Sequence, residues 1–247
     1  MEKKMIEANN TTTRVVKQIF RKYFKTQLAS LQPTMISRES RQITTMILEG
    51  EEFYKTCTHV CCYLPMLSGA EVNTMDIIVE SLRKKKDVFV PVLGDNDDMV
   101  MLRIRDESDL ATFEVKTKYK LLEPPAFSLP HRVNLLDTLS GECKILVIVP
   151  GLAFDYKLQR LGRGKGYYDK FFAQLQSLKQ EKQFQTYYVG VCFANQYIDE
   201  NFTFPQEVLK ELEQQTQHLC NSSWVIPTTS HDIAMDKVIY ASFKSTN

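Results

Sequence analysis

Apolar and polar positions along the chain follow two periods, which predict helices and strands in turn. In residues 12–31, apolar side chains recur every three or four positions, as on one face of an amphipathic helix. Residues 144–149, by contrast, form a short and almost continuous apolar run, which is typical of a buried strand in a parallel sheet. The same patterns predict further helices at 38–54, 73–86, 167–181 and 205–219, and further strands at 58–64, 87–92, 99–104, 186–193, 224–226 and 236–241.

The order of these elements predicts the fold class. Helices and strands alternate, which indicates an α/β protein with a largely parallel sheet. Because ligands bind at the carboxyl ends of the strands in such sheets, we expect the loop after 144–149 at a binding site. We expect a flexible N-terminus at 1–11, a single domain over 12–243, and a surface insertion with an amphipathic helix at about 200–222.

Composition and charge narrow the class of protein. The 247 residues suit one or at most two domains, and contents of 43% apolar and 25% charged residues are ordinary for a globular protein. A net charge of +1 argues against general binding to nucleic acids or membranes, and no apolar run approaches the roughly 18 residues of a membrane span. The first ten residues lack the apolar core of a signal peptide, so we expect a cytoplasmic monomer, with a mitochondrial location left open.

A group of cysteines and a histidine resembles a metal site at first sight. Cys57, His59, Cys61 and Cys62 lie close together in the sequence. Alternation along a strand would send neighbouring side chains to opposite faces, and no second cysteine pair stands at zinc spacing. We therefore interpret the cysteines as buried side chains of a strand.

The candidate chemistry lies in a loop where glycines alternate with cations. Arg163 and Lys165 stand between Gly162, Gly164 and Gly166, after a predicted strand and before a predicted helix. Glycine permits positive φ and a close approach of the backbone, while the amides of a helix N-terminus and fixed cations together bind phosphate. The pattern indicates a nucleotide-phosphate site, and a solvated basic turn is the alternative.

This loop matches neither of the two commonest nucleotide fingerprints. A P-loop needs Gly, four residues and then Gly-Lys-Ser/Thr, but Gln159 stands at the position of its first glycine and Gly166 follows the lysine. The dinucleotide pattern fails because its third glycine would be Tyr167.

A basic row runs along the predicted helix 12–31. Lys17, Arg21 and Lys25 stand four positions apart and therefore lie on one helix face. By spacing alone, a solvated face is the ordinary explanation of such a row.

Two motifs give the chain a family resemblance. Pro-Gly-Leu-Ala-Phe-Asp at 150–155 and Arg-Leu-Gly-Arg-Gly-Lys-Gly-Tyr-Tyr-Asp at 160–169 closely resemble the signature of the 5-formyltetrahydrofolate cyclo-ligase (methenyltetrahydrofolate synthetase) family, and the second motif is highly specific. Weaker similarity extends from about residue 14 to 241. It includes Lys-Gln-Ile-Phe-Arg at 17–21, Tyr-Leu-Pro-Met at 63–66, Glu-Val-Asn-Thr at 71–74 and the segment 227–240.

The resemblance implies an ATP- and Mg²⁺-dependent ligase. Such an enzyme converts 5-formyltetrahydrofolate to 5,10-methenyltetrahydrofolate, with ADP and phosphate, by way of a phosphorylated formyl group. The implied fold is the three-layer α/β type of sugar-phosphate isomerases and CoA transferases, with helices on both faces of a mostly parallel sheet. Two other classes stay open: a folate- or nucleotide-binding relative without activity, and an ATP-dependent ligase or kinase for another substrate on the same scaffold.

The resemblance also implies roles for single residues. Lys165, Arg163 and Tyr167 would carry the catalysis, while Asp169 and Asp232 would bind Mg²⁺. The ATP contacts would be Lys17, Arg21, Gly162, Gly164, Gly166 and Tyr168. The folate contacts would be Leu64, Glu71, Arg163, Gly164, Lys165, Gly166 and Tyr167.

The chain departs from the family pattern at the substrate end. Val92 and Leu93 stand where relatives usually carry a basic residue, and Ser68 and Gly69 look like an insertion before Glu71. The phosphate end follows the pattern throughout.

Overall fold

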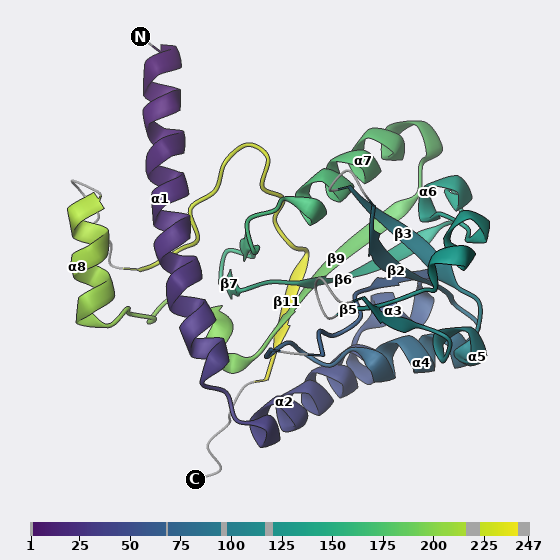
Figure 1. Cartoon of the computed structure of the whole chain (residues 1–247). Coiled ribbons are helices and arrows are strands. Elements are labelled where there is room, and N and C mark those ends of the chain that lie inside the picture. The colour runs from purple at the N-terminus through teal and green to yellow at the C-terminus, as the bar shows by residue number, and fades with distance from the viewer. Residues whose placement is uncertain (1, 68, 95–97, 117–120, 216–222, 242–247) are drawn as a thin grey trace.

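A six-stranded sheet forms the centre of the computed structural model, which describes residues 2–67, 69–94, 98–116, 121–215 and 223–241 (Figure 1). Every neighbouring pair of strands is parallel except β2 and β3, so the prediction of a largely parallel sheet is confirmed. In spatial order the strands are β11 (Lys237–Tyr240), β9 (Gln185–Cys192), β6 (Lys144–Pro150), β1 (His59–Cys62), β2 (Asp87–Leu93) and β3 (Met99–Ile104).

Alternation along the strands divides the interior into two apolar cores, one on each face of the sheet. In β1, for example, Val60 and Cys62 belong to one core and Cys61 to the other. Helices α1 to α4 cover the first core and α6 and α7 the second, which gives three layers (Figure 1). The helices are α1 (Glu2–Ala29), α2 (Pro33–Thr45), the π-helix η1 (Met46–Gly50), α3 (Glu52–Thr56), α4 (Met75–Arg83), α5 (Glu107–Leu110), α6 (Leu135–Thr138) and α7 (Tyr167–Lys182).

Two helices differ most from their predicted bounds, and the predicted helix 73–86 is shorter, because α4 covers only Met75–Arg83. Helix α1 begins at Glu2 rather than at residue 12, because no proline or glycine interrupts the helix-forming residues between them. The predicted helix 38–54 begins earlier, at Pro33, since proline suits the first turn of a helix. It is also divided into α2, η1 and α3. The flexibility of the N-terminus and the single domain stay predictions.

Several short elements had no signal in the sequence. The sheet β10-β7-β8 and the antiparallel pair of β4 and β5 contain strands of only two or three residues, which is too few to show a period. These elements are β4 (Glu114–Lys116), β5 (Leu121–Glu123), β7 (Ala153–Asp155), β8 (Arg160–Leu161), β10 (Tyr197–Ile198) and the 3-10 helices η2 (Ala126–His131) and η3 (Ala194–Gln196).

The predicted strand at 224–226 is wrong. The segment is irregular because its groups bond and pack elsewhere. Ile226 donates its backbone N–H to the Asp155 carboxylate at 2.7 Å, and the Trp224 ring packs edge-on against Phe204 at 5.3 Å between ring centroids. All other predicted strands lie within two residues of their predicted bounds.

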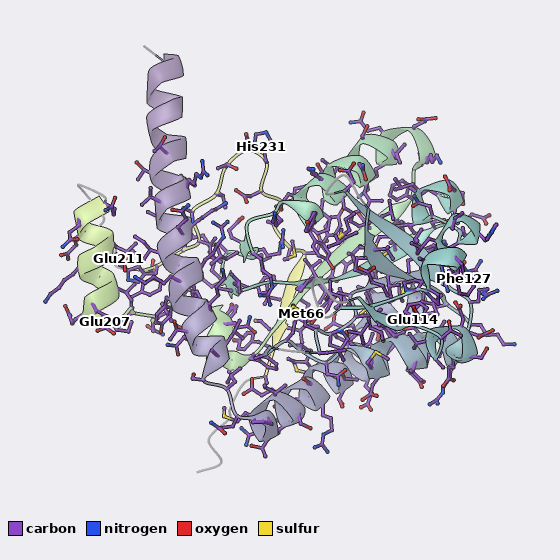
Figure 2. All side chains as sticks on the ribbon, in the orientation of Figure 1. Met66, Glu114, Phe127, Glu207, Glu211 and His231 are labelled. Atoms are coloured by element: carbon purple, nitrogen blue, oxygen red, sulfur yellow. The ribbon has the colours of Figure 1, made fainter. Side chains whose placement is uncertain are left out.

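The predicted surface insertion contains α8 (Gln206–Gln215), which lies beside α1 on the side away from the sheet (Figures 1 and 2). Leu212 of α8 is buried in the first core, and Glu211 forms an exposed ion pair of 3.1 Å with Lys22 of α1. The insertion therefore covers the outer side of the first helix. The predicted last turn, residues 216–219, lies outside the described residues.

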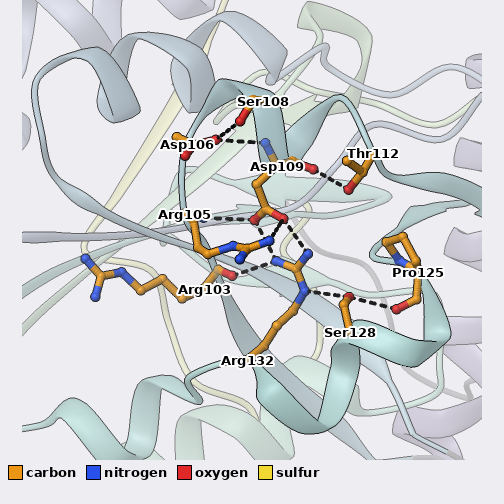
Figure 3. A network of polar contacts seen from close by, with 9 residues as sticks. All are labelled: Arg103, Arg105, Asp106, Ser108, Asp109, Thr112, Pro125, Ser128 and Arg132. Atoms are coloured by element: carbon orange, nitrogen blue, oxygen red, sulfur yellow. Dashed lines mark hydrogen bonds and ion pairs between the residues drawn. The ribbon is translucent and has the colours of Figure 1, made fainter.

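A buried carboxylate fastens the segment after β5 to the edge of the main sheet (Figure 3). Asp109 of α5 accepts two hydrogen bonds of 2.7 and 2.8 Å from Arg132, which follows η2. Arg105, directly after β3, adds a backbone bond of 2.9 Å and a side-chain bond of 3.1 Å. Burial by itself would raise the pKa of Asp109, but the bonds from the two arginines outweigh it and lower the pKa to about 2.

We expect Asp109→Asn to lower the free energy of unfolding by about 3 kcal/mol at pH 7, because it leaves the buried Arg132 guanidinium without a charged partner. The pKa of Asp109 is lowered on folding, so its stabilisation is fully present above the pKa of the unfolded chain, near 3.9. It is then lost as the pH falls through about 2. Urea denaturation should therefore show that the difference in the free energy of unfolding between wild type and variant becomes smaller as the pH falls from about 5 to about 2.

The exposed acid Asp98 provides the control for this measurement. It faces Lys170 at 3.4 Å on the surface, so Asp98→Asn should change stability by less than about 1 kcal/mol at any of these pH values. If Asp109→Asn lowered the free energy of unfolding by the same amount at every pH, the role assigned to the charge of Asp109 would be contradicted.

Gly190 of β9 lies where a side chain would collide with an aromatic ring. A Cβ at this position would stand 2.4 Å from the ring of Phe154, which is fully buried. We expect Gly190→Ala to lower the free energy of unfolding by about 1–3 kcal/mol and the melting temperature by several degrees. Gly50→Ala is the control, because a Cβ there would meet nothing within 4 Å. Equal melting temperatures for the two variants would refute this packing account.

Candidate active site

The glycine and cation loop joins β8 to the N-terminus of α7. Gly164 and Gly166 adopt positive φ values of 100° and 72°, which side chains other than glycine rarely adopt. Gly166 is also the N-cap residue of α7, and its carbonyl accepts the backbone N–H of Lys170 at 3.0 Å. The loop therefore brings its backbone to the positive end of the helix, as the predicted phosphate site requires.

A cavity of about 230 Å³ opens beside this loop, and we call it the basic cavity. It lies between the loop, α1 and the segment before β11. Five cationic and two acidic side chains give it an excess of positive charge, which suits a polyanion. Its lining residues are Lys17, Arg21, Pro150, Gly151, Arg160, Leu161, Gly162, Arg163, Gly164, Lys165, Gly166, Tyr167, Tyr168, Asp169 and Asp232.

The basic row of α1 divides between this cavity and the solvent. Lys17 and Arg21 line the basic cavity, whereas Lys25 is exposed and does not. Arg21 donates from Nε to the Gly162 carbonyl at 2.9 Å, so the helix and the loop are bonded directly. Partial burial lowers the pKa of Arg21, while the charges of Asp232 and Asp169 act in the opposite direction.

Each acid of the basic cavity is balanced by a cation. Lys17 donates to both oxygens of Asp232, at 2.8 and 2.6 Å, and Thr229 adds a backbone bond of 2.6 Å. Arg160 donates to Asp169 at 2.8 Å. Burial by itself would raise the pKa of Asp232, but the bonds from Lys17 and Thr229 outweigh it and hold the pKa below its ordinary value. The carboxylate of Asp232 is therefore suited to stay ionised.

Arg160 is a site residue that the sequence prediction missed. Its side chain is 7% exposed, and it binds the Pro150 carbonyl at 3.3 Å as well as Asp169. The guanidinium also lies over the ring of Tyr168, 5.4 Å from its centroid. The only signal was its place at the head of the glycine motif, since its partners come from two other elements, β6 and α7.

A second cavity, of about 380 Å³, lies at the carboxyl ends of β1 and β2, and we call it the apolar cavity. Leu64 and Glu71, the predicted folate contacts after β1, line it together with Leu93. Leu93 gives this wall an apolar surface. The lining residues are Tyr63, Leu64, Met66, Glu71, Pro91, Leu93, Met99, Leu121, Leu122, Glu123, Pro150, Arg163, Lys165, Tyr167 and Tyr168.

Glu71 is one of the two acids that line the apolar cavity, the other being Glu123. Its carboxylate accepts the Met66 backbone N–H at 3.3 Å and meets the Arg163 guanidinium at 3.4 Å. Burial raises the pKa of Glu71, and Arg163 partly offsets this. The chain beside it is held by the Tyr63 hydroxyl, which donates to the Val72 carbonyl at 2.9 Å.

The two cavities share a wall, and the residues expected to carry the chemistry form it. Arg163, Lys165, Tyr167 and Tyr168 line both cavities, together with Pro150. The sequence placed these residues in one loop, but it gave no sign that two cavities meet there. It also missed the part of the apolar cavity that β5 contributes, because that part comes from a proline-rich stretch with no clear period.

The cysteines near β1 are buried side chains, as predicted. Cys57, Cys61 and Cys62 are free thiols, and none of these residues is more than 3% exposed to solvent. Burial raises the pKa of Cys62 to about 12. Within the described part of the chain, there is no cluster of three or more His, Cys, Asp or Glu residues that could hold a metal ion. None of the helices formed by the described residues is both long and apolar enough to span a membrane.

Comparison with known proteins gives the family of this two-cavity α/β protein. The model of the 5-formyltetrahydrofolate cyclo-ligase family matches residues 13–209, and the chain therefore belongs to that family. The chain is 32% identical to a probable 5-formyltetrahydrofolate cyclo-ligase of Schizosaccharomyces pombe over 184 residues, which cover 74% of this chain and 85% of the relative. It is 30% identical to the mitochondrial 5-formyltetrahydrofolate cyclo-ligase of Arabidopsis thaliana, over 86% of this chain and 76% of the relative.

Solved structures agree with this family at the level of the fold. A 5,10-methenyltetrahydrofolate synthetase of Aquifex aeolicus matches with a TM-score of 0.59 and 22% identity, over 91% of this chain and 89% of that one. The synthetase of Mycoplasma pneumoniae matches with a TM-score of 0.53 and 15% identity, over 92% and 97%. The likeness supports the mixed α/β fold with its mostly parallel sheet.

Proposed function

We propose that the protein is an ATP-dependent ligase that cyclises 5-formyltetrahydrofolate to 5,10-methenyltetrahydrofolate and releases ADP and phosphate. The observation that carries this proposal is the shared wall, where Arg163 and Lys165 line the basic and the apolar cavity at once. A reaction that moves a phosphoryl group from one substrate to another needs such a junction, because positioning and charge neutralisation supply most of the catalysis. Membership of the cyclo-ligase family supports the choice of substrates.

The charges of the two cavities suggest which substrate each one holds. The basic cavity suits the triphosphate of ATP, with Lys17, Arg21 and the glycine amides as donors. The apolar cavity suits the ring system of the folate, since its wall is apolar apart from a few polar groups such as Glu71. The formyl group would then lie near Lys165, beside the terminal phosphate.

With this placement, the reaction that the family resemblance implies would proceed in two steps. The formyl oxygen attacks the terminal phosphorus of ATP, and ADP leaves with the electrons of the broken P–O bond. The folate nitrogen N10 then attacks the activated formyl carbon, the C–O bond breaks, and phosphate leaves with the former formyl oxygen while N10 loses its proton. Lys165 and Arg163 would neutralise the charge that develops on the transferred group, and the loop amides provide donors that are already oriented.

The donor set of the basic cavity fits a magnesium ion. Asp169 and Asp232 line the same cavity, and each accepts hydrogen bonds from a cationic side chain. Mg²⁺ in nucleotide sites is usually held by one or two carboxylates, phosphate oxygens and water. When bound, it would supply positive charge to the phosphates.

The test of the proposal is the formation of the methenyl product, followed by its near-ultraviolet absorbance, together with ADP. We expect both to appear in equal amounts with 5-formyltetrahydrofolate and Mg-ATP, and neither to appear when ATP is omitted. Binding of folate without consumption of ATP would instead identify a binding protein without activity. Consumption of ATP with a different acceptor would identify another ligase or kinase.

Three finer expectations belong to the same proposal. The fold would be the type shared by sugar-phosphate isomerases and CoA transferases, for which the order of parallel strands is the support. The protein would act as a monomer on small molecules, without nucleic acid or membrane partners. The cytoplasm is the expected location, although one relative carries the word mitochondrial in its name.

A further inference from the structure

A fully buried carboxylate bonds two segments that each lead into the basic cavity. Asp155 ends β7, and none of its surface is exposed to solvent. One of its oxygens accepts the backbone N–H groups of Lys157 and Gln159, each at 2.9 Å, and the other accepts that of Ile226 at 2.7 Å. Burial raises the pKa of Asp155, and these three bonds partly offset the effect. The carboxylate thus joins parts of the chain that are 71 residues apart.

The first of these segments leads into the glycine and cation loop. Gln159 is the last residue of the turn between β7 and β8, and Arg160 follows it directly. In the loop that comes next, the Gly162 carbonyl accepts the Arg21 side chain at 2.9 Å. The bonds to Asp155 therefore fix the chain immediately before the residues that line the basic cavity.

The second segment, residues 223–236, leads to Asp232, and we call it the C-terminal arm. It passes from α1 to β11 (Figure 1). Three residues after Ile226, Thr229 donates its backbone N–H to Asp232 at 2.6 Å and its hydroxyl at 2.9 Å. Lys17 of α1 donates to both oxygens of the same carboxylate. The position of Asp232 therefore depends on the arm as well as on α1.

Together these bonds form a closed ring around the basic cavity. The loop is bonded to α1 through Arg21, and α1 is bonded to the C-terminal arm through Lys17. Asp155 bonds the arm to the turn before the loop and so completes the ring. Since Asp155 itself lines neither cavity, it can act on a ligand only through the backbone that it holds.

We propose that Asp155 is a positioning residue for the nucleotide: by bonding the C-terminal arm to the turn before the glycine loop, it sets the separation between the loop and Asp232 that the triphosphate of ATP requires. This inference rests on the proposed function. A shift of about 1 Å in a positioning group can lower a rate by about 100-fold, so a fixed separation matters for phosphoryl transfer. The motif at 150–155 ends with Asp155, but the family resemblance gave this acid no role.

Asp155→Asn tests this inference because it keeps the shape of the side chain and replaces one oxygen by an amino group. The amide oxygen can still accept from Lys157 and Gln159, but the amino group then faces the Ile226 N–H, donor against donor. We expect the Kd of Mg-ATP to rise by about tenfold or more, which is within the usual range for coupled sites. The Kd of 5-formyltetrahydrofolate should change by less than about twofold, because the turn and the loop keep their bonds. Calorimetry with one substrate at a time measures both constants without turnover.

This variant should fold, because both ends of the C-terminal arm are held independently of Asp155. The hydroxyls of Ser223 and Tyr156 lie 3.1 Å apart, and Met235 donates its backbone N–H to the Leu158 carbonyl at 2.9 Å. The substitution therefore releases the middle of the arm, which leads to the cavity.

Asp109→Asn is the matched control. It also removes the charge of a buried aspartate that accepts a backbone N–H, but Asp109 lines neither cavity and lies outside the ring of bonds. It should lower the melting temperature at least as much as Asp155→Asn does. It should nevertheless leave the Kd of Mg-ATP within about twofold of the wild type. A purely structural role of Asp155 would instead make the two variants alike in their binding of Mg-ATP.

Hydrogen exchange in the wild type tests the same coupling without a substitution. Coupling is reciprocal, so if the bonds at Asp155 favour the binding of ATP, bound ATP must favour these bonds. Mg-ATP should therefore slow exchange at the Ile226 amide more than at the Arg105 amide, which is bonded to Asp109. Equal slowing at the two amides would show that ATP stabilises only the fold as a whole.

The outcomes separate this inference from the proposed function. A wild-type protein that fails to bind Mg-ATP would refute the proposed function, and the inference with it. Wild-type binding combined with an Asp155→Asn variant that binds Mg-ATP as tightly, or that loses affinity for the folate to the same extent, would overturn the inference alone. If the variant does not fold, the exchange measurement decides, and equal slowing at the two amides overturns the inference.

Discussion

Lys165→Ala is expected to lower kcat by two to three orders of magnitude, which is the usual effect of removing a donor that stabilises developing charge. Lys165 lines the shared wall of the two cavities and makes no ion pair with any described residue, so its ammonium is available to the transferred phosphoryl group. For the same reason the substitution should leave the melting temperature unchanged. Steady-state kinetics with both substrates, combined with thermal unfolding, measure the two effects separately.

The control for this variant is Lys170→Ala. Lys170 is an exposed lysine of α7 that lines neither cavity and faces Asp98 at 3.4 Å, so its loss should leave kcat within about twofold of the wild type. Near-normal turnover of Lys165→Ala would contradict the role given to the shared wall. A fall in turnover that only accompanies unfolding would do so as well.

Arg160→Ala is expected to affect stability and turnover together. It leaves Asp169 without its cation and removes the stacking on Tyr168, so we expect a loss of about 3 kcal/mol in the free energy of unfolding. Turnover of the folded protein should fall by about 100-fold or more, since Asp169 and Tyr168 both line the basic cavity and would lose their orientation. Urea denaturation and kinetics under native conditions report the two quantities.

Arg160→Lys separates charge from geometry. A lysine keeps the positive charge but cannot bind Pro150 and Asp169 in the fixed planar arrangement of a guanidinium, so this variant should fall between the wild type and Arg160→Ala. Arg83→Ala removes an exposed arginine that pairs with Glu107 at 2.9 Å, and should cost less than about 1 kcal/mol. Equal stability of Arg160→Ala and Arg83→Ala would contradict the structural role of Arg160.

The parts of the fold that could be predicted are the segments whose secondary structure follows from their own local sequence pattern. The run 144–149 is apolar enough to be a buried strand in any arrangement, and β6 occupies it with one further residue. The segment 99–104 matches β3 without any shift. Segment 224–226 looked equally apolar, but its backbone pairs with the side chain of Asp155, and nothing local indicates such a partner.

The candidate site likewise has a part that could be predicted from the sequence and a part that could not. The glycine loop and its cations could be found because they are contiguous, and positive φ at Gly164 and Gly166 agrees with the choice of glycine there. From their spacing alone, Lys17 and Arg21 were expected on a solvated helix face. Only the family resemblance predicted that they contact a ligand. Arg160 and the wall contributed by β5 went unpredicted because their roles arise from contacts between segments far apart in the sequence.

The transfer of the formyl oxygen is the most direct test of the account, because it requires the contents of the two cavities to meet at Lys165. The protein would be given 5-formyltetrahydrofolate labelled with ¹⁸O in the formyl group, together with Mg-ATP, and the released phosphate would be analysed by mass spectrometry. The account predicts one ¹⁸O atom in each phosphate released, in step with the methenyl product. Unlabelled phosphate formed at the same rate as the product would contradict it, because water rather than the formyl group would then have attacked ATP.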